Sequence, residues 1–397
     1  MKNNYKFINF ILVLLMIILS KTIFFGSLYK DTVMYVYIII CIIILLLKGI
    51  SRKNISILIL MLILSSISIV MNFSSIDNLS WINIKRMVIE LLPIAIIASY
   101  LSKKDFIKNY VNIMTIISLI SLIHIFIVYF APNFIEFMSR KIILGNHPYI
   151  ISPFYTWGWN DIFERNSGPF WEPGAFQGYI NIAILSIIFY KNDIKYLKCK
   201  ILILIITLIT TQSTTGYIVF LIIIIMFGFN IIKEFTNNLL IKILIVFMII
   251  GSGIYIISSN NISNKLEVEN GSTIMRSNDF GQSLKMISEK PLGYGNTYEK
   301  TIRERSLGII NNSNGILSMA YTYGIIFFMY YIYRLIVGLQ NTFRVTNIIK
   351  RIGIVAIFII LHSTEGLVWL PIYLIFVFKW KDEENKNNKI EDLRNEG

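Results

Sequence analysis

Long apolar runs recur along this chain and constrain its fold more than any other feature. They begin near residue 6 and continue almost to residue 380, and a transmembrane helix needs about twenty mainly apolar residues. With 55% hydrophobic and 15% charged residues, a chain of 397 residues is too apolar to be soluble. We therefore expect an all-α polytopic membrane protein in which residues 1–380 form a single integral membrane domain.

The apolar runs predict about twelve transmembrane helices, some of them short enough that one neighbouring pair can be re-entrant. No small-residue cleavage site follows the first run, so we expect that run to be kept as a span. The expected spans are 6–27, 32–48, 54–72, 84–101, 107–130, 172–190, 200–211, 215–230, 239–258, 314–338, 351–363 and 365–379.

Lysine and arginine predict the orientation of these spans. Basic residues favour the cytoplasmic side of a membrane, which places both termini in the cytoplasm. This pattern explains most of the net charge of +14, so the charge implies no nucleic-acid partner. The mixed-charge tail 381–397 is expected to be disordered. The basic segments placed inside are residues 1–5, 48–54, 102–108, 191–200, 230–238, 340–351 and the tail from 379.

Two long connections, 131–170 and 259–312, fall on the opposite, outer side. Both exceed what a compact helical bundle needs, and connections of this length are usually functional or disordered. The first is rich in aromatic residues, and both contain arginine. Aromatic and basic external loops suit sugars and diphosphates as ligands.

The stretch DIFERNSGPFWEPGAFQG, residues 161–178, concentrates charge, glycine and proline where an apolar run begins. Glu172 precedes Pro173, and a carboxylate and a proline both suit the start of a helix. One interpretation is therefore structural, with Glu172 as a helix-start charge and Arg165 as an interfacial residue. The other is that Arg165 holds an anionic ligand while Glu172 orients or deprotonates a hydroxyl, with Trp171 beside the acceptor.

The second outer loop carries three arginines, Arg276, Arg303 and Arg305. Arg276 begins a predicted amphipathic helix with Phe280, Leu284 and Ile287 on one face, and Pro291 with the turn 293–295 ends it. The glycines of that turn follow no strand and precede no phosphate-loop lysine, so they do not predict a phosphate loop. Arg276 either lies on a surface helix or binds an anion.

Histidine is scarce, with three residues in the chain. His362 and Glu365 are three residues apart near the outer end of a span, where a neutral imidazole can accept a proton from a hydroxyl. The alternative is an ordinary polar connection between two helices. His124 lies within a span and is expected to be buried, whereas His147 is a loop residue that can contact substrate.

No metal site, cofactor or disulfide is expected. The acidic residues are scattered, and Cys41 and Cys199 lie far apart in or at the end of apolar runs. Arginine would therefore have to neutralise any bound diphosphate.

Four motifs together resemble the Wzy-type polysaccharide polymerases, which share a superfamily with the O-antigen ligases. Each is loose alone, but the four occur in the expected order on the predicted outer face or its edge. They are RNSGPFWEPGAF (165–176), TTQSTTGYIVFLI (210–222), MRSNDFGQSLKMISEKPLGYG (275–295) and NNSNGILSMAYTYGII (311–326).

The resemblance implies a helical fold similar to the type C glycosyltransferase class, with its site facing outward from a bacterial inner membrane. Such enzymes transfer a growing glycan from undecaprenyl diphosphate to the non-reducing end of a lipid-linked repeat unit. Their conserved arginines correspond to Arg165 and Arg276, their acidic-proline pair to Glu172 and Pro173, and the ligase histidine to His362. The reaction is expected to be metal-independent and inverting, with a flippase and a chain-length regulator as possible partners.

Two other functions remain open. An O-antigen ligase shares the donor and the arginines but attaches the finished glycan to a lipid core. A flippase or transporter of lipid-linked oligosaccharide is predicted to carry charges at mid-bilayer and a repeat between its halves. The charges here gather in the outer loops instead, which favours an enzyme.

Overall fold

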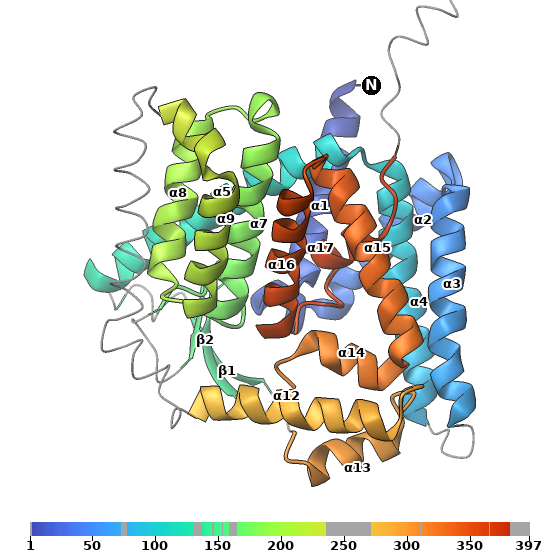
Figure 1. Cartoon of the computed structure of the whole chain (residues 1–397). Coiled ribbons are helices and arrows are strands. Elements are labelled where there is room, and N and C mark those ends of the chain that lie inside the picture. Colours follow the sequence, from blue (N-terminus) through green and yellow to red (C-terminus); the bar gives the residue numbers. More distant parts are fainter. Residues whose placement is uncertain are drawn as a thin grey trace, which may run out of the picture.

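The computed structural model is mainly helical, and most of its helices run roughly along one direction (Figure 1). Three helices, α12, α13 and α14, lie across one end of this bundle instead (Figure 1). The structure describes residues 2–72, 78–130, 133, 137, 139–144, 147–152, 154–158, 165–235, 271–309, 312–364 and 366–381.

The longer helices, except for α12, coincide with the apolar runs of the sequence. They are α1 (Lys2–Leu19), α2 (Lys30–Lys48), α3 (Arg52–Met71), α4 (Asn78–Tyr100), α5 (Lys103–Phe130), α7 (Pro173–Phe189), α8 (Leu197–Thr210), α9 (Thr214–Phe235), α12 (Gly271–Glu289), α15 (Ile325–Phe343) and α16 (Ile348–Thr364). The shorter ones are the π-helix η1 (Phe24–Leu28), the 3-10 helices η3 (Lys191–Asp193) and η4 (Ile375–Val377), and α13 (Tyr298–Ser306), α14 (Gly315–Tyr323) and α17 (Pro371–Leu374).

Within the described residues, three helices are long and apolar enough to cross a membrane: Lys30–Lys48, Arg52–Met71 and Lys103–Val128. A fourth is possible if α15 and α16, bent by 119° at their junction, are one span. These helices fit the predicted membrane protein, but the count of twelve spans is not confirmed. The predicted span 239–258 lies outside the described residues.

Two predicted spans differ from the structure. The span 314–338 is broken into α14 and α15 at Gly324, which has a left-handed φ of 90°. The span 365–379 contains only the short elements α17 and η4. Both regions are apolar enough to resemble spans, but the first is interrupted by a glycine and the second begins its helix only at Pro371.

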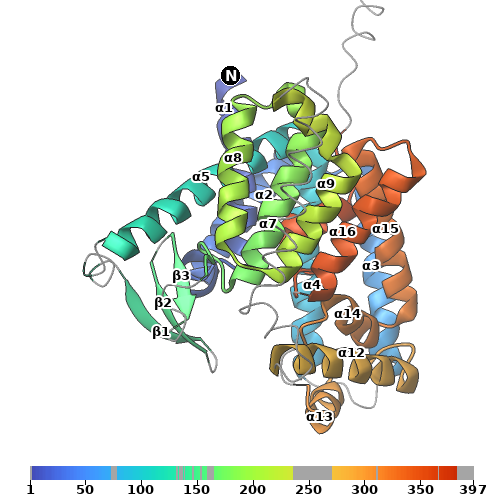
Figure 2. The same cartoon turned by 60° about the vertical axis from the view of Figure 1, so that its left-hand side comes forward.

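The chain is not all-α, because the first outer loop contains a small antiparallel sheet. Its strands, β1 (Arg140–Leu144), β2 (His147–Ile151) and β3 (Thr156–Gly158), are in the order β1-β2-β3. The sheet lies beneath the end of α5 (Figure 2), where Ile150 and Tyr155 pack with Val128. Backbone pairing satisfies polar groups that an irregular loop would leave to water.

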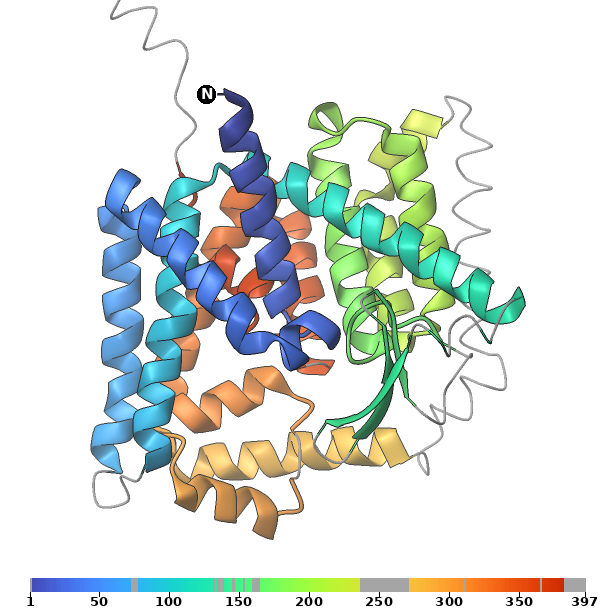
Figure 3. The ribbon, with the colours of Figure 1, turned by 180° about the vertical axis from the view of Figure 1, so that it is seen from behind.

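The segments predicted to be cytoplasmic meet at the end of the bundle where the N-terminus lies (Figure 1). Asn54 and Lys379 exchange two hydrogen bonds of 2.8 Å, and Lys381 N donates to Ala98 O at 2.8 Å. The sheet, α12 and α13 lie at the opposite end (Figure 3). The described residues thus separate into two ends of the bundle.

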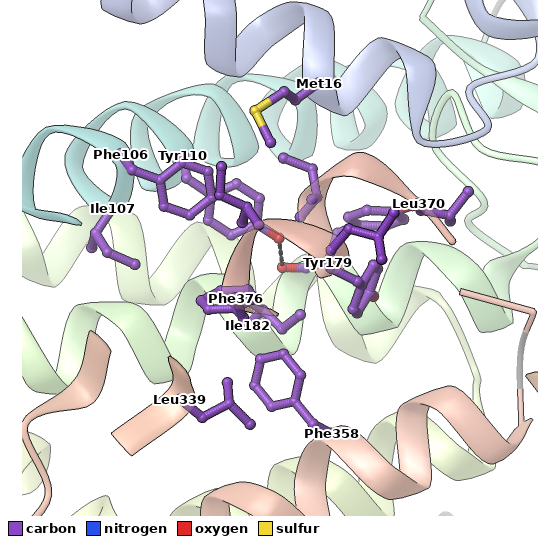
Figure 4. Packing of buried hydrophobic residues seen from close by; sticks show 14 of the residues in the cluster. Met16, Phe106, Ile107, Tyr110, Tyr179, Ile182, Leu339, Phe358, Leu370 and Phe376 are labelled. Atoms are coloured by element: carbon purple, nitrogen blue, oxygen red, sulfur yellow. Dashed lines mark hydrogen bonds between the residues drawn. The ribbon is translucent and has the colours of Figure 1, made fainter. Parts of the chain in front are cut away.

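Helix α7 forms the centre of the bundle. Fifteen consecutive residues, Gly174–Ile188, are buried, because the helix is apolar on all sides and packs against α5, α8 and α9. Around it, Tyr110 Oη donates a 2.9 Å hydrogen bond to Tyr179 O within a cluster that includes Phe106, Phe358 and Phe376 (Figure 4). The start of α7 is therefore supported by a rigid core.

The PLGYG turn, residues 291–295, is a packing device at the break between α14 and α15. Tyr294 N donates to Tyr321 O, and Gly295 N donates to Thr322 O, each at 2.9 Å. Gly293 has a φ of 89°, and a Cβ there would lie 2.5 Å from Gly324 N. Only glycine permits both this backbone conformation and this approach.

We expect Gly293→Ala to lower the free energy of unfolding by about 2 kcal/mol or more, because the new methyl group meets backbone atoms at a left-handed position. Thermal unfolding of the detergent-purified protein measures this. Gly281→Ala is the matched control: it lies on α12 with no atom within 4 Å of its added Cβ. That variant should be neutral or up to about 1 kcal/mol more stable. Equal destabilisation of both variants would contradict the assignment.

Candidate functional site

The segment from Arg165 to Glu172 crosses the outer end of the bundle and is anchored by the fully buried Asn166. Asn166 N donates to Thr210 O at 2.9 Å, and Asn166 Nδ2 donates to Thr210 Oγ1 at 2.9 Å and to Ser121 Oγ at 3.1 Å. Asn166 Oδ1 accepts from Gly168 N at 2.9 Å. One amide side chain therefore joins this segment to α5 and to the end of α8.

Arg165 lies next to the turn that connects α8 to α9. Its Nε donates a 3.3 Å hydrogen bond to Thr211 O, and its side chain is partly exposed. A guanidinium group has five N–H donors, so it can contact Thr211 O and further acceptors at the same time. Arg165 can therefore remain attached to the bundle and bind an anion as well.

The middle of the segment is held on both sides. Thr156 N of β3 donates to Gly168 O at 2.7 Å, and Ile23 N donates to Pro169 O at 2.9 Å. Gly168 has a φ of 50°, and a Cβ there would lie 2.8 Å from the Phe176 ring. The RNSGP motif thus forms a tight connection between the sheet and the N-terminal part of the chain.

Glu172 directly precedes α7, and Pro173 occupies the first turn, as predicted. The Glu172 side chain makes no capping hydrogen bond; its Oε1 accepts one from Trp171 Nε1 instead. Burial and then the Glu172 carboxylate raise the pKa of the Tyr149 hydroxyl on β2. The carboxylate is thus partly exposed and bound to an indole, rather than serving as a simple helix cap.

Lys21 is a neighbour that the sequence did not predict. Its Nζ lies 4.8 Å from the centre of the Trp171 ring. The residue follows the first helix and is about 150 positions from Trp171, so no local pattern links the two.

His362 is fully buried on α16. Its Nδ1 lies 2.6 Å from Phe358 O, one turn earlier, and its ring is edge-on to Tyr373 with centroids 5.1 Å apart. Its Nε2 has no hydrogen-bond partner among the described residues. Glu365 lies outside the described residues, but a Cβ at Gly366 would lie 3.8 Å from Lys21 Nζ. The chain following His362 therefore comes close to the Lys21 and Trp171 pair.

The three arginines of the second outer loop have different surroundings. Arg303 Nε donates to Glu289 Oε2 at 2.8 Å, and Arg303 Nη2 pairs with Glu289 Oε1. This bidentate pair joins α13 to α12. Arg276 and Arg305 are exposed, and the start of α12, which carries Arg276, lies on the same side as β1 (Figures 1 and 3).

Helix α12 is amphipathic with its apolar face turned outward. Phe280 and Leu284 are about half exposed, whereas Asp279, Ser283 and Met286 are buried. Asp279 Oδ2 accepts from the backbone N and the Oγ of Ser313, at 3.0 and 2.9 Å. Met286 is buried in an apolar cluster with Tyr294 and Tyr321, and Ile287 of the predicted apolar face packs against that cluster. These apolar contacts and the polar contacts to Ser313 together hold the helix.

Several expected site features are not brought together by the described residues. His147 belongs to β2, but its side chain is outside the described part of the structure. No three His, Cys, Asp or Glu side chains in the described ranges could jointly hold a metal ion. A cavity of about 240 Å³ lies at the opposite end, where Lys104, Asp193 and Arg344 line it, so it does not belong to this site.

Comparison with known proteins identifies one family. Residues 200–332 match the model of the family described as O-antigen ligase. The match confirms the predicted likeness to the superfamily of O-antigen ligases and polymerases, a class of membrane glycosyltransferase-like enzymes. With the apolar helices, it indicates an integral membrane protein. No curated protein and no solved structure matches the chain significantly.

We expect Asn166→Ala to lower the free energy of unfolding by about 2–4 kcal/mol, because Ser121 Oγ and Gly168 N lose a buried partner. Thermal unfolding in detergent measures the loss. Asn192→Ala, at an exposed position of η3, serves as the control and should change stability by less than about 0.5 kcal/mol. An Asn166→Ala protein as stable as the control would contradict the anchoring role.

The Arg303–Glu289 pair predicts a pH dependence. The hydrogen bond from Arg303 holds the pKa of Glu289 below its ordinary value of 4.5. A lowered carboxyl pKa contributes stability at higher pH that is lost as the pH falls below the ordinary value. Thermal unfolding midpoints should therefore fall as the pH drops from about 5 to about 3, and fall less in Arg303→Gln. Arg305→Gln, on the same helix, should keep the wild-type dependence; equal slopes in Arg303→Gln and wild type would refute the pairing.

Proposed function

We propose that this protein is a polymerase of surface polysaccharide repeat units. It transfers the growing glycan from undecaprenyl diphosphate to the non-reducing end of a lipid-linked repeat unit at the outer face of the membrane. One observation carries the proposal: Arg165 and Asn166 are hydrogen-bonded to Thr211 and Thr210. These two threonines lie where α8 ends, within the segment that matches the family. The RNSGPFWEPG motif and the family domain therefore build one site.

Arginine supplies the charge that this reaction needs. As the bond between the anomeric carbon and the diphosphate oxygen breaks, negative charge grows on the leaving diphosphate. Arg165 is oriented by Thr211 O, and a guanidinium group suits the oxygens of a diphosphate. Arg276 is the second candidate, on the sheet side of α12, and Arg305 is a third; Arg303 is engaged by Glu289 and acts mainly in holding α13.

Glu172 is the favoured base. Its carboxylate is partly exposed beside Trp171, so it can accept the proton of an acceptor hydroxyl while the indole lies against the sugar. The acceptor oxygen then attacks the anomeric carbon from the side opposite the diphosphate, which inverts that carbon in one displacement. His362 is the alternative base; its buried ring and its contact with Phe358 O favour a positioning role.

The proposed orientation in the membrane rests on the different character of the two ends of the helical bundle. The described parts of the basic connections lie at the end of the bundle that contains Lys2 and Lys381, and this end suits the cytoplasmic side of a bacterial inner membrane. The sheet and α12 lie at the other end (Figure 3), which we assign to the outer side. A flippase that delivers repeat units and a regulator of chain length are the partners such a reaction requires or uses.

An O-antigen ligase is the second candidate, because the matched family carries that description. The products in a strain lacking the gene separate the possibilities. Loss of a polymerase leaves a single capped repeat, and loss of a ligase leaves bare lipid core with polymer stranded on the carrier. Loss of a flippase leaves no surface product and would refute both enzymes.

In a strain lacking the native gene, we expect Arg165→Ala to reduce polymer synthesis at least about 100-fold, because the leaving diphosphate loses its oriented cation. Gel profiles of the surface glycan measure chain length and amount. Arg140→Ala, exposed on β1 at the same end, is the matched control and should leave the profile unchanged. Wild-type polymer from Arg165→Ala at equal protein levels would overturn the assignment.

A further inference from the structure

The turn after α1 holds Lys21 in a defined position at the site. Lys21 has a φ of 66°, a left-handed conformation that is unfavourable for a residue other than glycine. Contacts on both sides impose it. Tyr179 Oη donates to Ser20 O at 2.6 Å, and Ile372 N donates to Ser20 Oγ at 3.3 Å.

The residues that follow Lys21 are paired with the RNSGPFWEPG motif itself. Thr22 forms an antiparallel bridge with Phe170, and Ile23 N donates to Pro169 O at 2.9 Å. This pairing directs the Lys21 side chain along Trp171, where Nζ lies 4.8 Å from the ring centre. The whole N-terminal turn is therefore built onto the segment that carries Arg165 and Glu172.

The chemistry of this corner suits a phosphorylated ligand. The Lys21 side chain is exposed, and its ammonium group lies over the face of an indole whose N–H is already used by Glu172. A lysine ammonium group carries three N–H donors, so it can contact an aromatic face and more than one acceptor. Arg165 stands at the start of the segment and Lys21 at its end, so the two cations flank the same stretch of chain.

We propose that Lys21 is a substrate-binding residue that holds an oxygen of the carrier diphosphate from the side opposite Arg165. This inference rests on the proposed function, because it takes the diphosphate as the ligand. A diphosphate spreads its charge over two phosphorus centres, and two separate cations match that charge better than Arg165 alone. Lys21 thereby joins the first helix of the chain to the reaction.

The test is binding of undecaprenyl diphosphate and of undecaprenyl alcohol to the full-length protein in detergent, measured by native mass spectrometry. Lys21→Gln should weaken diphosphate binding by about tenfold and leave alcohol binding unchanged. Lys21→Arg should stay within about threefold of wild type. Lys30→Gln, an exposed lysine at the start of α2, is the matched control and should bind as wild type does.

Charge rescue tests the same inference independently of folding differences. Lys21→Cys treated with an aminoethyl methanethiosulfonate should regain diphosphate affinity, whereas a sulfonatoethyl reagent should not restore it. Wild type treated alike controls for Cys41 and Cys199.

The outcomes separate the two proposals. Wild type binding the diphosphate no better than the alcohol would overturn both the function and the role of Lys21. Preferential binding by wild type together with equal affinity in Lys21→Gln, or rescue by either reagent alike, would overturn the role of Lys21 alone.

Discussion

The buried amide of Asn166 is the interaction on which the outer end of this protein depends. It joins α5, the end of α8 and the chain before α7 through three side-chain hydrogen bonds, two donated and one accepted. A buried amide left without partners is costly, so the segment has few alternative conformations. Arg165 and Glu172 lie on either side of Asn166 in the sequence, so this anchor also restricts their backbone. Charge that is positioned in advance stabilises a developing anion.

A second constraint is close backbone approach at glycine. Gly168 lies against Phe176, and Gly293 meets Gly324 at the break between α14 and α15. In both motifs the glycines serve the packing of the chain rather than contact with phosphate.

Local signals predicted much of this architecture. Uninterrupted apolar runs located α2, α3 and α5, and Pro173 marked the start of α7. The sheet was missed, although Gly145 and Asn146 separate two stretches rich in isoleucine, a pattern typical of a hairpin. The length of this connection favours an irregular loop, whereas the hairpin signal spans only a few residues.

The remaining features depend on contacts that no local pattern contains. The break at Gly324 requires Leu292, whose backbone lies against it, and the apolar face of α12 points outward because Asp279 binds Ser313. No local pattern marks Asn166 as an anchor, because its partners Ser121 and Thr210 lie 45 and 44 positions away in the sequence. Lys21 and Trp171 are far apart in the sequence and come together only in the folded protein.

The hydrogen bond from Ile372 N to Ser20 Oγ has a consequence for biosynthesis. Residue 20 emerges from the ribosome long before residue 372. The turn after α1 can therefore form this hydrogen bond only when almost the entire protein has been made. A prematurely terminated chain would insert its early helices and still lack this closure. Completion of this turn is thereby tied to completion of translation.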